Sequence, residues 1–297
     1  MLVSKKIPIP YIFNKIKFDV VYVLSIWLLV NFLTTEFPTI VPALPVVIPA
    51  FIGVAISVIL SFKLNQSYDR WWEARKIWGT IVNESRNFVL QLQSYVAKEK
   101  YLEIKEIAYR HIAWCYALGQ NLRELNPTEN IKNLISYEDL AHIENQLHKP
   151  LALMQLNTLK ITQLRKENAI ELTGQVQLDN TIVNLSNAMG MAESIKNTIF
   201  PITYRLFLHF FIYIFVITFS IALQDIESYF EIPLLLTISS VFFLLEKSST
   251  HLQDPFINRP TDTAMTAIAQ TIEINIKQLI GEREEVSTTQ PETYYIL

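Results

Sequence analysis

Few side chains of this 297-residue sequence have the types and spacing that chemistry requires. His111 and Cys115 lie four residues apart, so one face of a helix would present an imidazole and a thiol to a metal ion. Two ligands do not complete a metal site, and packing in a helical core accounts for the pair more simply. His209 is the only ionisable group between Leu206 and Gln224, and we expect it to hydrogen bond to a backbone carbonyl or a serine. No serine, histidine and aspartate arrangement stands out, so we expect no enzyme, no catalytic residue, no metal and no cofactor.

A second pattern lies in an apolar segment of the chain. The uncharged stretch from Phe37 to Phe62 carries two stripes of residues at helical spacing. Small residues that let helices approach closely form the first stripe: Gly53, Ser57 and Ser61. Bulky residues form the second stripe, rotated by one position: Val54, Val58 and Phe62. If the first stripe packs against a neighbouring helix, the second can face a symmetry axis. Because every face of this segment is apolar, the second stripe can also face lipid or protein.

Charged and aromatic residues follow the apolar stretch at once. The sequence from Lys63 to Trp78 mixes basic and acidic side chains with three tryptophans, and it has no proline or glycine before Gly79. Tryptophan with basic residues is typical of the interface between membrane and water. We therefore predict one long helix that leaves the bilayer and continues into the cytoplasm. Two roles are open for the charged residues of this helix. They form ion pairs between subunits, or they lie on a face that water solvates.

The composition divides the chain between two environments. It is 51% hydrophobic and 18% charged with a positive mean hydropathy, which is too apolar for a soluble protein and too charged for one wholly in lipid. A net charge of -3 without a dense basic run gives no reason to expect nucleic acid. Cys115 is the single cysteine, so an internal disulfide is excluded. The six glycines form no phosphate-binding loop of either common pattern.

The apolar segments predict four membrane spans: Phe18–Thr35, Leu44–Phe62 with a kink at Pro49, Leu206–Gln224 and Ile232–Leu245. The fourth is short, so Glu231 or Glu246 must lie near an interface, or the helix must be shielded by neighbours. Helical periodicity predicts further helices at Tyr101–Leu125, Tyr137–Leu147, Leu151–Arg165, Val176–Phe200 and Ala264–Ile280. The segment Gly281–Leu297 is expected to be a disordered tail.

The basic residues set the expected orientation in the membrane. The loops 36–43 and 225–231 contain no lysine or arginine, whereas the terminal segments and the middle region carry essentially all of them. By the positive-inside rule, both termini and the middle region are cytoplasmic, in a multi-pass protein of the plasma membrane. The outer loops would give the external face a negative rim if their acidic side chains are exposed: Glu36, Asp225, Glu227 and Glu231.

Three stretches of this sequence resemble the prokaryotic bestrophin-like family. The first is Ser61–Gly79, SFKLNQSYDRWWEARKIWG, whose Arg-Trp-Trp core animal bestrophins share. The second, Glu193–Tyr204, resembles the family's entry into its third span, and the third is Asp254-Pro255-Phe256 after the fourth span. The order and spacing of these stretches fit the family from about Ile7 to Gly281. The resemblance is therefore highly specific.

The resemblance implies an all-α membrane protein that forms a homopentamer around one axial pore. It implies a narrow hydrophobic neck at Val54, Val58 and Phe62, and a second aperture in the cytosol at Thr173. It also implies a signature at the cytoplasmic mouth, structural or at a subunit interface: Asp69, Arg70, Trp71, Trp72 and Glu73. The calcium-binding acidic cluster of animal members is not matched, because Arg259 stands in a region without an acidic run.

On this basis the chain divides into four parts: 1–64, with the first two spans and a pore helix at 44–62; 65–203, a cytosolic helical domain; 204–247, with the third and fourth spans; and 248–297, a cytosolic helix and tail. The expected function is an anion channel for ions such as chloride, whose partners are further copies of the chain, membrane lipid and the permeant ions. A channel for monovalent cations, favoured by the acidic outer loops, and a non-conducting membrane scaffold remain as alternatives.

Overall fold

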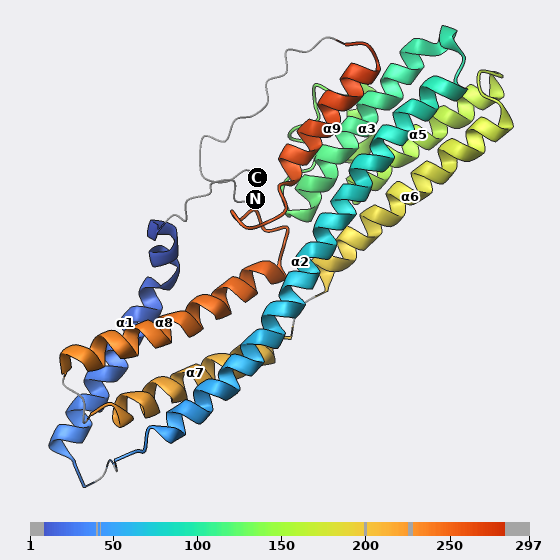
Figure 1. The fold of residues 1–297 in the computed structure, drawn as a ribbon. Helices are drawn as coiled ribbons and strands as arrows, with labels where there is room; N and C mark the ends of the chain where they lie inside the picture. The colour runs from blue at the N-terminus through green and yellow to red at the C-terminus, as the bar shows by residue number, and fades with distance from the viewer. Residues whose placement is uncertain (1–8, 40, 42, 199–200, 225–227, 283–297) are drawn as a thin grey trace. The chain divides into compact units, whose positions relative to one another are not determined.

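The computed structural model describes residues 9–39, 41, 43–198, 201–224 and 228–282. Helices make up nearly all of these residues, and the one strand-like feature among them is an isolated bridge between Val96 and Ile170. This described part has nine α-helices. Figure 1 shows their arrangement and labels most of them. The prediction of an all-α fold is confirmed. The predicted tail lies outside the described residues apart from Gly281 and Glu282.

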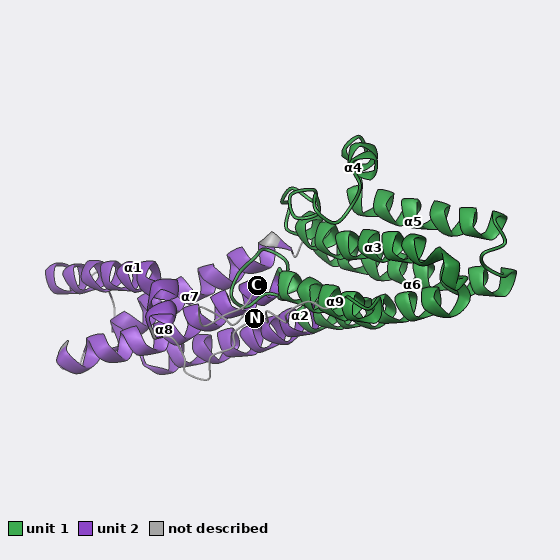
Figure 2. Cartoon of the chain, turned by 90° about the horizontal axis from the view of Figure 1, so that it is seen from above, with its two compact units in different colours: residues 1–3, 71–198, 254–297 green, residues 4–70, 199–253 purple. Residues whose placement is uncertain are grey.

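The described residues form two compact units, which are coloured separately in Figure 2. Of the described residues, unit 2 contains 9–70 and the described part of 199–253, and unit 1 contains Trp71–Thr198 and 254–282. The helices of unit 2 are α1 (Ile9–Glu36), the first part of α2 (Val47–Tyr95), α7 (Ile202–Ala222) and α8 (Ser228–Gln253). Each of these four helices is long and apolar enough to cross a membrane. The prediction of four spans is confirmed.

Helix α2 is unbroken over 49 residues. At 1.5 Å per residue it is about 74 Å long, more than twice the thickness of the hydrocarbon core of a bilayer. The prediction of one long helix is therefore confirmed. The predicted kink at Pro49 is wrong, because Pro49 is the third residue of α2, where a backbone N–H has no partner within the helix in any case.

Unit 1 is a helical bundle built around α3 (Tyr101–Leu122). Thirteen of the 22 residues of α3 are buried, so neighbours surround this helix on most sides. The short 3-10 turn Lys98–Lys100 leads into α3 from α2. The other helices of the bundle are α4 (Tyr137–Glu144), α5 (Lys149–Lys166), α6 (Leu172–Asn197) and α9 (Met265–Leu279). Trp78 of α2 and Trp114 of α3 are among the largest fully buried side chains of this core.

The helix ends differ from the sequence prediction where a local contact decides them. The predicted end of α3 at Leu125 is three residues too late, because Arg123 and Glu124 turn back onto carbonyl groups of the last turn. Glu124 then has a positive φ of 60°, so the helix cannot continue through this residue. Helix α8 extends beyond the predicted segment Ile232–Leu245 at both ends.

Candidate functional site

One face of α2 in unit 2 is apolar and is not covered by the rest of the chain. Val54, Val58 and Phe62 are 63%, 52% and 63% exposed. The helix packs through its other side, where Ile56 and Leu60 are buried among apolar residues of this unit. Successive helical residues are about 100° apart, so the two sets point in roughly opposite directions. The three bulky side chains are therefore open to lipid, to another copy of the chain or to a symmetry axis.

The predicted stripe of small residues contacts other helices only in part. A Cβ atom on Gly53 would lie 3.3 Å from Phe215 and 3.8 Å from Phe242, so α7 and α8 approach this position closely. Ser57 and Ser61 are exposed. Within one chain the buried face of α2 is rotated away from these two serines, so packing of the whole stripe would need another copy of the chain and stays a prediction.

A buried ion pair follows the exposed apolar face. Lys63 Nζ lies 2.8 Å from Oε1 of Glu246 in α8, and the two side chains are 0% and 2% exposed. The same Nζ lies 2.9 Å from Oγ1 of Thr250, whose hydroxyl lies 2.8 Å from that carboxylate oxygen. One turn further along α2, Ser67 Oγ lies 3.0 Å from Ser249 Oγ, and both are buried. These polar contacts join α2 to α8.

His209 of α7 completes this polar group. Its Nε2 lies 3.6 Å from Oε2 of Glu246, and its Nδ1 lies 3.0 Å from the carbonyl oxygen of Arg205. The predicted hydrogen bond to a backbone carbonyl is confirmed. Glu246 is shielded by its neighbours, Lys63 among them, as one of the two alternatives for this helix requires.

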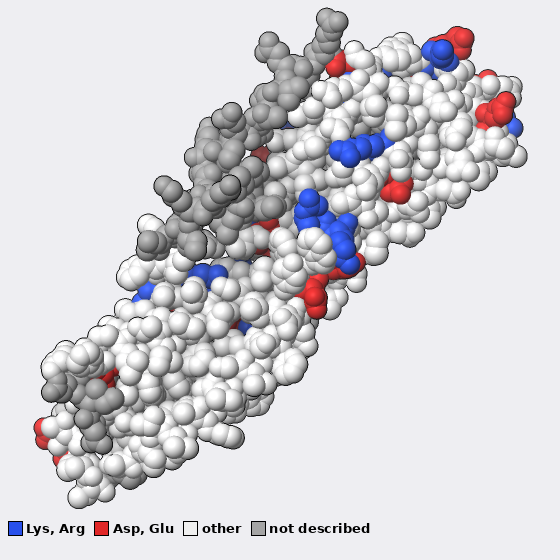
Figure 3. All heavy atoms as spheres, viewed as in Figure 1, with Lys and Arg blue, Asp and Glu red and all other residues white. Residues whose placement is uncertain are grey.

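Sequence reasoning missed the pairing of Lys63 with Glu246. The signal it had was a single lysine and a single glutamate at the edges of two uncharged runs. A second pair in this unit, Asp19 of α1 with Lys247 of α8, was missed in the same way. On the surface seen in Figure 3, charged atoms are sparse over the helices of unit 2, as expected for helices that face lipid.

The signature residues occupy adjacent turns of α2: Asp69, Arg70, Trp71, Trp72 and Glu73. Trp71 has a structural role within the chain, because its indole Nε1 donates a hydrogen bond of 3.0 Å to the carbonyl oxygen of Thr261, in the segment before α9. The ring of Trp72 lies 6.2 Å from that of Trp71 and is half exposed. Glu73 forms an exposed ion pair with Lys76, at 2.5 Å.

Thr173 lies in unit 1, in the first turn of α6, and is exposed. The next residue fixes the position of this turn. Gly174 packs so closely on α2 that an added Cβ atom would lie 2.8 Å from Cβ of Tyr95. Thr173 therefore lies in a helical turn that packs tightly against α2.

His111 and Cys115 lie in the core of unit 1. Burial lowers the pKa of His111 from 6.5 to about 3 and raises the pKa of the Cys115 thiol to about 12. His111 Nε2 lies 2.8 Å from Oγ of Ser85, whose own proton is donated to the carbonyl of Ile81. His111 therefore acts as a neutral core residue. Among the described residues, no three histidine, cysteine or acidic side chains gather as a metal site would require.

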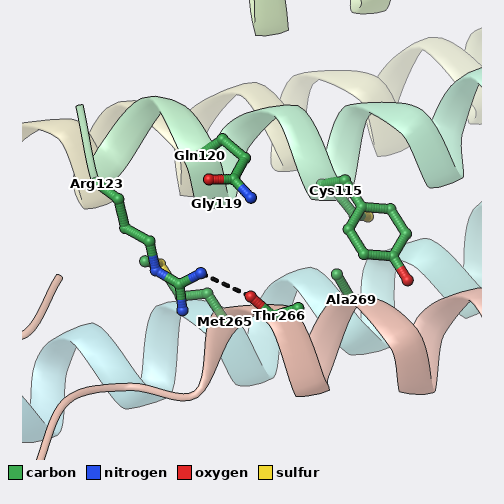
Figure 4. A pocket seen from close by; sticks show the side chains of 8 residues that line it. Cys115, Gly119, Gln120, Arg123, Met265, Thr266 and Ala269 are labelled. Carbon is green, nitrogen blue, oxygen red and sulfur yellow. Dashed lines mark hydrogen bonds between the residues drawn. The ribbon is translucent and has the colours of Figure 1, made fainter. Parts of the chain in front are cut away.

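The groove between α3 and α9 in Figure 4 is a packing contact rather than a binding site. Arg123 reaches across it and donates a hydrogen bond of 2.6 Å from a terminal nitrogen to Oγ1 of Thr266. Gly119 and Met265 bring the two helices together, and the groove leaves no room for a water molecule. Burial lowers the pKa of Arg123, and the charge of Asp262 opposes that shift.

Comparison with known proteins places this geometry in a family. The family described as Bacterial/Fungal Bestrophin protein matches residues 10–278. The chain is 26% identical over 234 residues to the Voltage-dependent anion channel-forming protein RSc3414 of Ralstonia nicotianae, covering 78% of this chain and 76% of that protein. It is 27% identical over 251 residues to the Voltage-dependent anion channel-forming protein YneE of Escherichia coli, covering 84% and 81% respectively.

Solved structures agree on the fold. The crystal structure of a bacterial bestrophin homologue from Klebsiella pneumoniae matches with a TM-score of 0.84 at 24% sequence identity. The match covers 91% of this chain and 100% of that one, so the arrangement of helices is shared almost throughout. The family match over nearly the whole chain and the shared helical architecture lead to one conclusion: this protein belongs to the bacterial and fungal bestrophin family.

Proposed function

We propose that this chain forms an anion-conducting channel, in which five copies surround one axial pore lined by Val54, Val58 and Phe62. The observation that carries the proposal is the uncovered apolar face of a membrane-spanning helix, on the side away from its packed face. One helix from one chain cannot enclose a pore, so conduction requires a closed ring of subunits. The names of the relatives, as anion channel-forming proteins, support both conduction and the sign of the ion. They name no catalytic activity, and we propose none.

The proposed neck works without binding ions. Valine and phenylalanine offer no ligands to a charge, so ions pass only while the neck is wide enough to hold water. A small narrowing expels the water and closes the path. Thr173 is proposed as the second constriction, where a ring of hydroxyl groups could contact a hydrated ion. The signature residues Asp69, Arg70, Trp72 and Glu73 are proposed to lie at contacts between subunits.

The proposed orientation places both termini in the cytoplasm and the four spans in the plasma membrane. The absence of lysine and arginine from the loops 36–43 and 225–231 supports this orientation. The predicted negative rim needs a correction, because of its two described residues Glu231 is buried and Glu36 is exposed. Asp225 and Glu227 lie outside the described residues.

Flux through liposomes that contain the purified protein tests the proposal. Val58→Trp should abolish chloride flux, because five indoles would fill the neck. Val241→Trp is the matched control: this valine of α8 is 49% exposed, close to the 52% of Val58, and is not on the proposed pore face. Equal flux in the two variants would refute the role of this face, and the absence of flux in any salt for the unmutated protein would favour the scaffold.

The reversal potential in a salt gradient decides the sign of the permeant ion. In asymmetric KCl, an anion channel moves the reversal potential toward the equilibrium potential of chloride. A shift toward the equilibrium potential of potassium would establish the cation-conducting alternative, which the exposed carboxylate of Glu36 favours.

A further inference from the structure

A polar cavity of about 230 Å³ lies among α1, α7 and α8 in unit 2. It is at the end of the unit where α1 and α7 finish and α8 begins. Apart from Val30, its lining is polar: Asn31, Thr34, Thr35, Ser220, Gln224 and Glu231. None of these residues belongs to α2, so the cavity is separate from the proposed neck.

Glu231 is the one acidic group in this lining, and it is 6% exposed. Its Oε1 accepts a hydrogen bond of 2.7 Å from the indole Nε1 of Trp27. No lysine, arginine or histidine within the described residues forms an ion pair with it. The other two acidic groups buried in this unit, Asp19 and Glu246, each have a lysine partner. A buried carboxylate without a cation is unfavourable, because burial removes the water that would solvate its charge.

The neutral groups around Glu231 present oxygen lone pairs to the cavity. The hydroxyl of Thr34 donates to the carbonyl of Val30 at 2.9 Å, and that of Thr35 donates to the carbonyl of Asn31 at 2.8 Å. Because these protons are already engaged within α1, the hydroxyl oxygens can act only as acceptors toward the cavity.

Ser220 of α7 adds another polar group to the lining. It is 1% exposed, and its Oγ has no hydrogen-bond partner in the described structure. A serine inside a helix can donate to the carbonyl four residues before it, which Ser220 does not do. A buried polar atom without a partner marks a place where a ligand or water completes the structure.

We propose that this cavity binds one monovalent metal cation, Na⁺ or K⁺, held by the Glu231 carboxylate and neutral oxygens that include Ser220 and Thr34. One carboxylate balances one positive charge, whereas Ca²⁺ sites use several carboxylates. The volume accommodates an ion with several water molecules, since each water occupies about 30 Å³. The bound ion balances the charge of Glu231, as a lysine balances the charge of each of the other two buried acids. Its ligands come from α1, α7 and α8, so it links these three helices.

Thermal unfolding of the full-length protein in detergent tests the site. NaCl, KCl and N-methyl-D-glucamine chloride are compared at equal concentration, so that chloride is constant. In NaCl, in KCl or in both, the unfolding temperature should be several degrees higher than in N-methyl-D-glucamine chloride. This difference should level off as the salt concentration is raised. Glu231→Gln keeps an oxygen acceptor for Trp27 but removes the charge, so it should lose this dependence. Glu36→Gln, an exposed acidic residue at the end of α1 that does not line the cavity, should keep it.

Equal unfolding temperatures in the three salts would overturn the proposal, as would an unchanged dependence in Glu231→Gln. If Glu231→Gln does not fold, crystals of the unmutated protein soaked in thallium(I) acetate give a second test. An anomalous peak in the cavity supports the site, and its absence from an ordered cavity refutes it. Neither measurement uses ion flux, so the result is independent of the proposed channel activity.

Discussion

Replacing Lys63 by methionine should destabilise the protein strongly. The Lys63 ammonium and the Glu246 carboxylate are 2.8 Å apart and buried. At that separation and an effective dielectric constant of about 20, their attraction is about 6 kcal/mol, most of which offsets the cost of removing both charges from water. Breaking a buried pair by removing one partner costs about 3–5 kcal/mol, because the other charge is left uncompensated. We expect the lower end of that range, since the hydroxyl of Thr250 still donates a hydrogen bond of 2.8 Å to the Glu246 carboxylate.

A double-mutant cycle separates the pair from its surroundings. The variants are Lys63→Met, Glu246→Gln and the double substitution, and their free energies of unfolding are measured by SDS titration with tryptophan fluorescence as the signal. Each single change should lower the free energy of unfolding by about 3 kcal/mol. The loss in the double variant should be smaller than the sum of the two single losses by at least about 2 kcal/mol. Lys196→Met is the matched control, because its partner Glu124 is 78% exposed and such pairs contribute less than about 1 kcal/mol.

Two results would refute this reasoning. If Lys63→Met costs no more than Lys196→Met, the buried pair does not join α2 to α8 as the distances indicate. If the double variant loses the full sum of the single changes, the two groups act independently, and their proximity has no energetic consequence.

Three further predictions concern unit 1. Gly174→Ala should lower the unfolding temperature, because the new Cβ would lie 2.8 Å from a side chain of α2, whereas Gly190→Ala in the same helix meets nothing within 4 Å and should raise it slightly. Between pH 6.5 and 3 the unfolded chain binds a proton at His111 that the folded protein does not, so the free energy of unfolding should fall with decreasing pH by up to about 1.4 kcal/mol per pH unit from this residue. His111→Gln should flatten that slope and His142→Gln, an exposed residue, should not. Cys115 should resist maleimide in the folded protein at pH 8 and react once per chain in SDS, since its thiol is buried with a pKa of about 12; native labelling would contradict this.

The spans and the helices were predictable because they depend on residues close together in the sequence. Uncharged runs of sufficient length predict membrane helices, and the periodicity from Tyr101 onward predicts α3. The family was predictable for a related reason, because the signature from Ser61 to Gly79 lies in one helix. The predictions of where helices end were less accurate, because contacts made by a few backbone groups decide these positions.

The candidate site was predictable only as a set of positions. The resemblance selected Val54, Val58 and Phe62, and the structure adds that they are exposed and lie away from the packed face. Their place on an axis stays a prediction, because it depends on contacts between copies of the chain. The second constriction at Thr173 and the proposed contacts of the signature residues stay predictions for the same reason.

The sequence by itself determined which segments are apolar enough for lipid, that the chain is helical, and which family it belongs to. Only the tertiary structure decided which charges are buried and with what partner. Lys63 is an ordinary interfacial lysine in the sequence, and its partner is 183 residues away. Glu231 has a similar position in the sequence but pairs with no lysine in the part of the chain that the structure describes. The physical reason is that the cost of burying a charge depends on the groups around it in space, which local sequence does not specify.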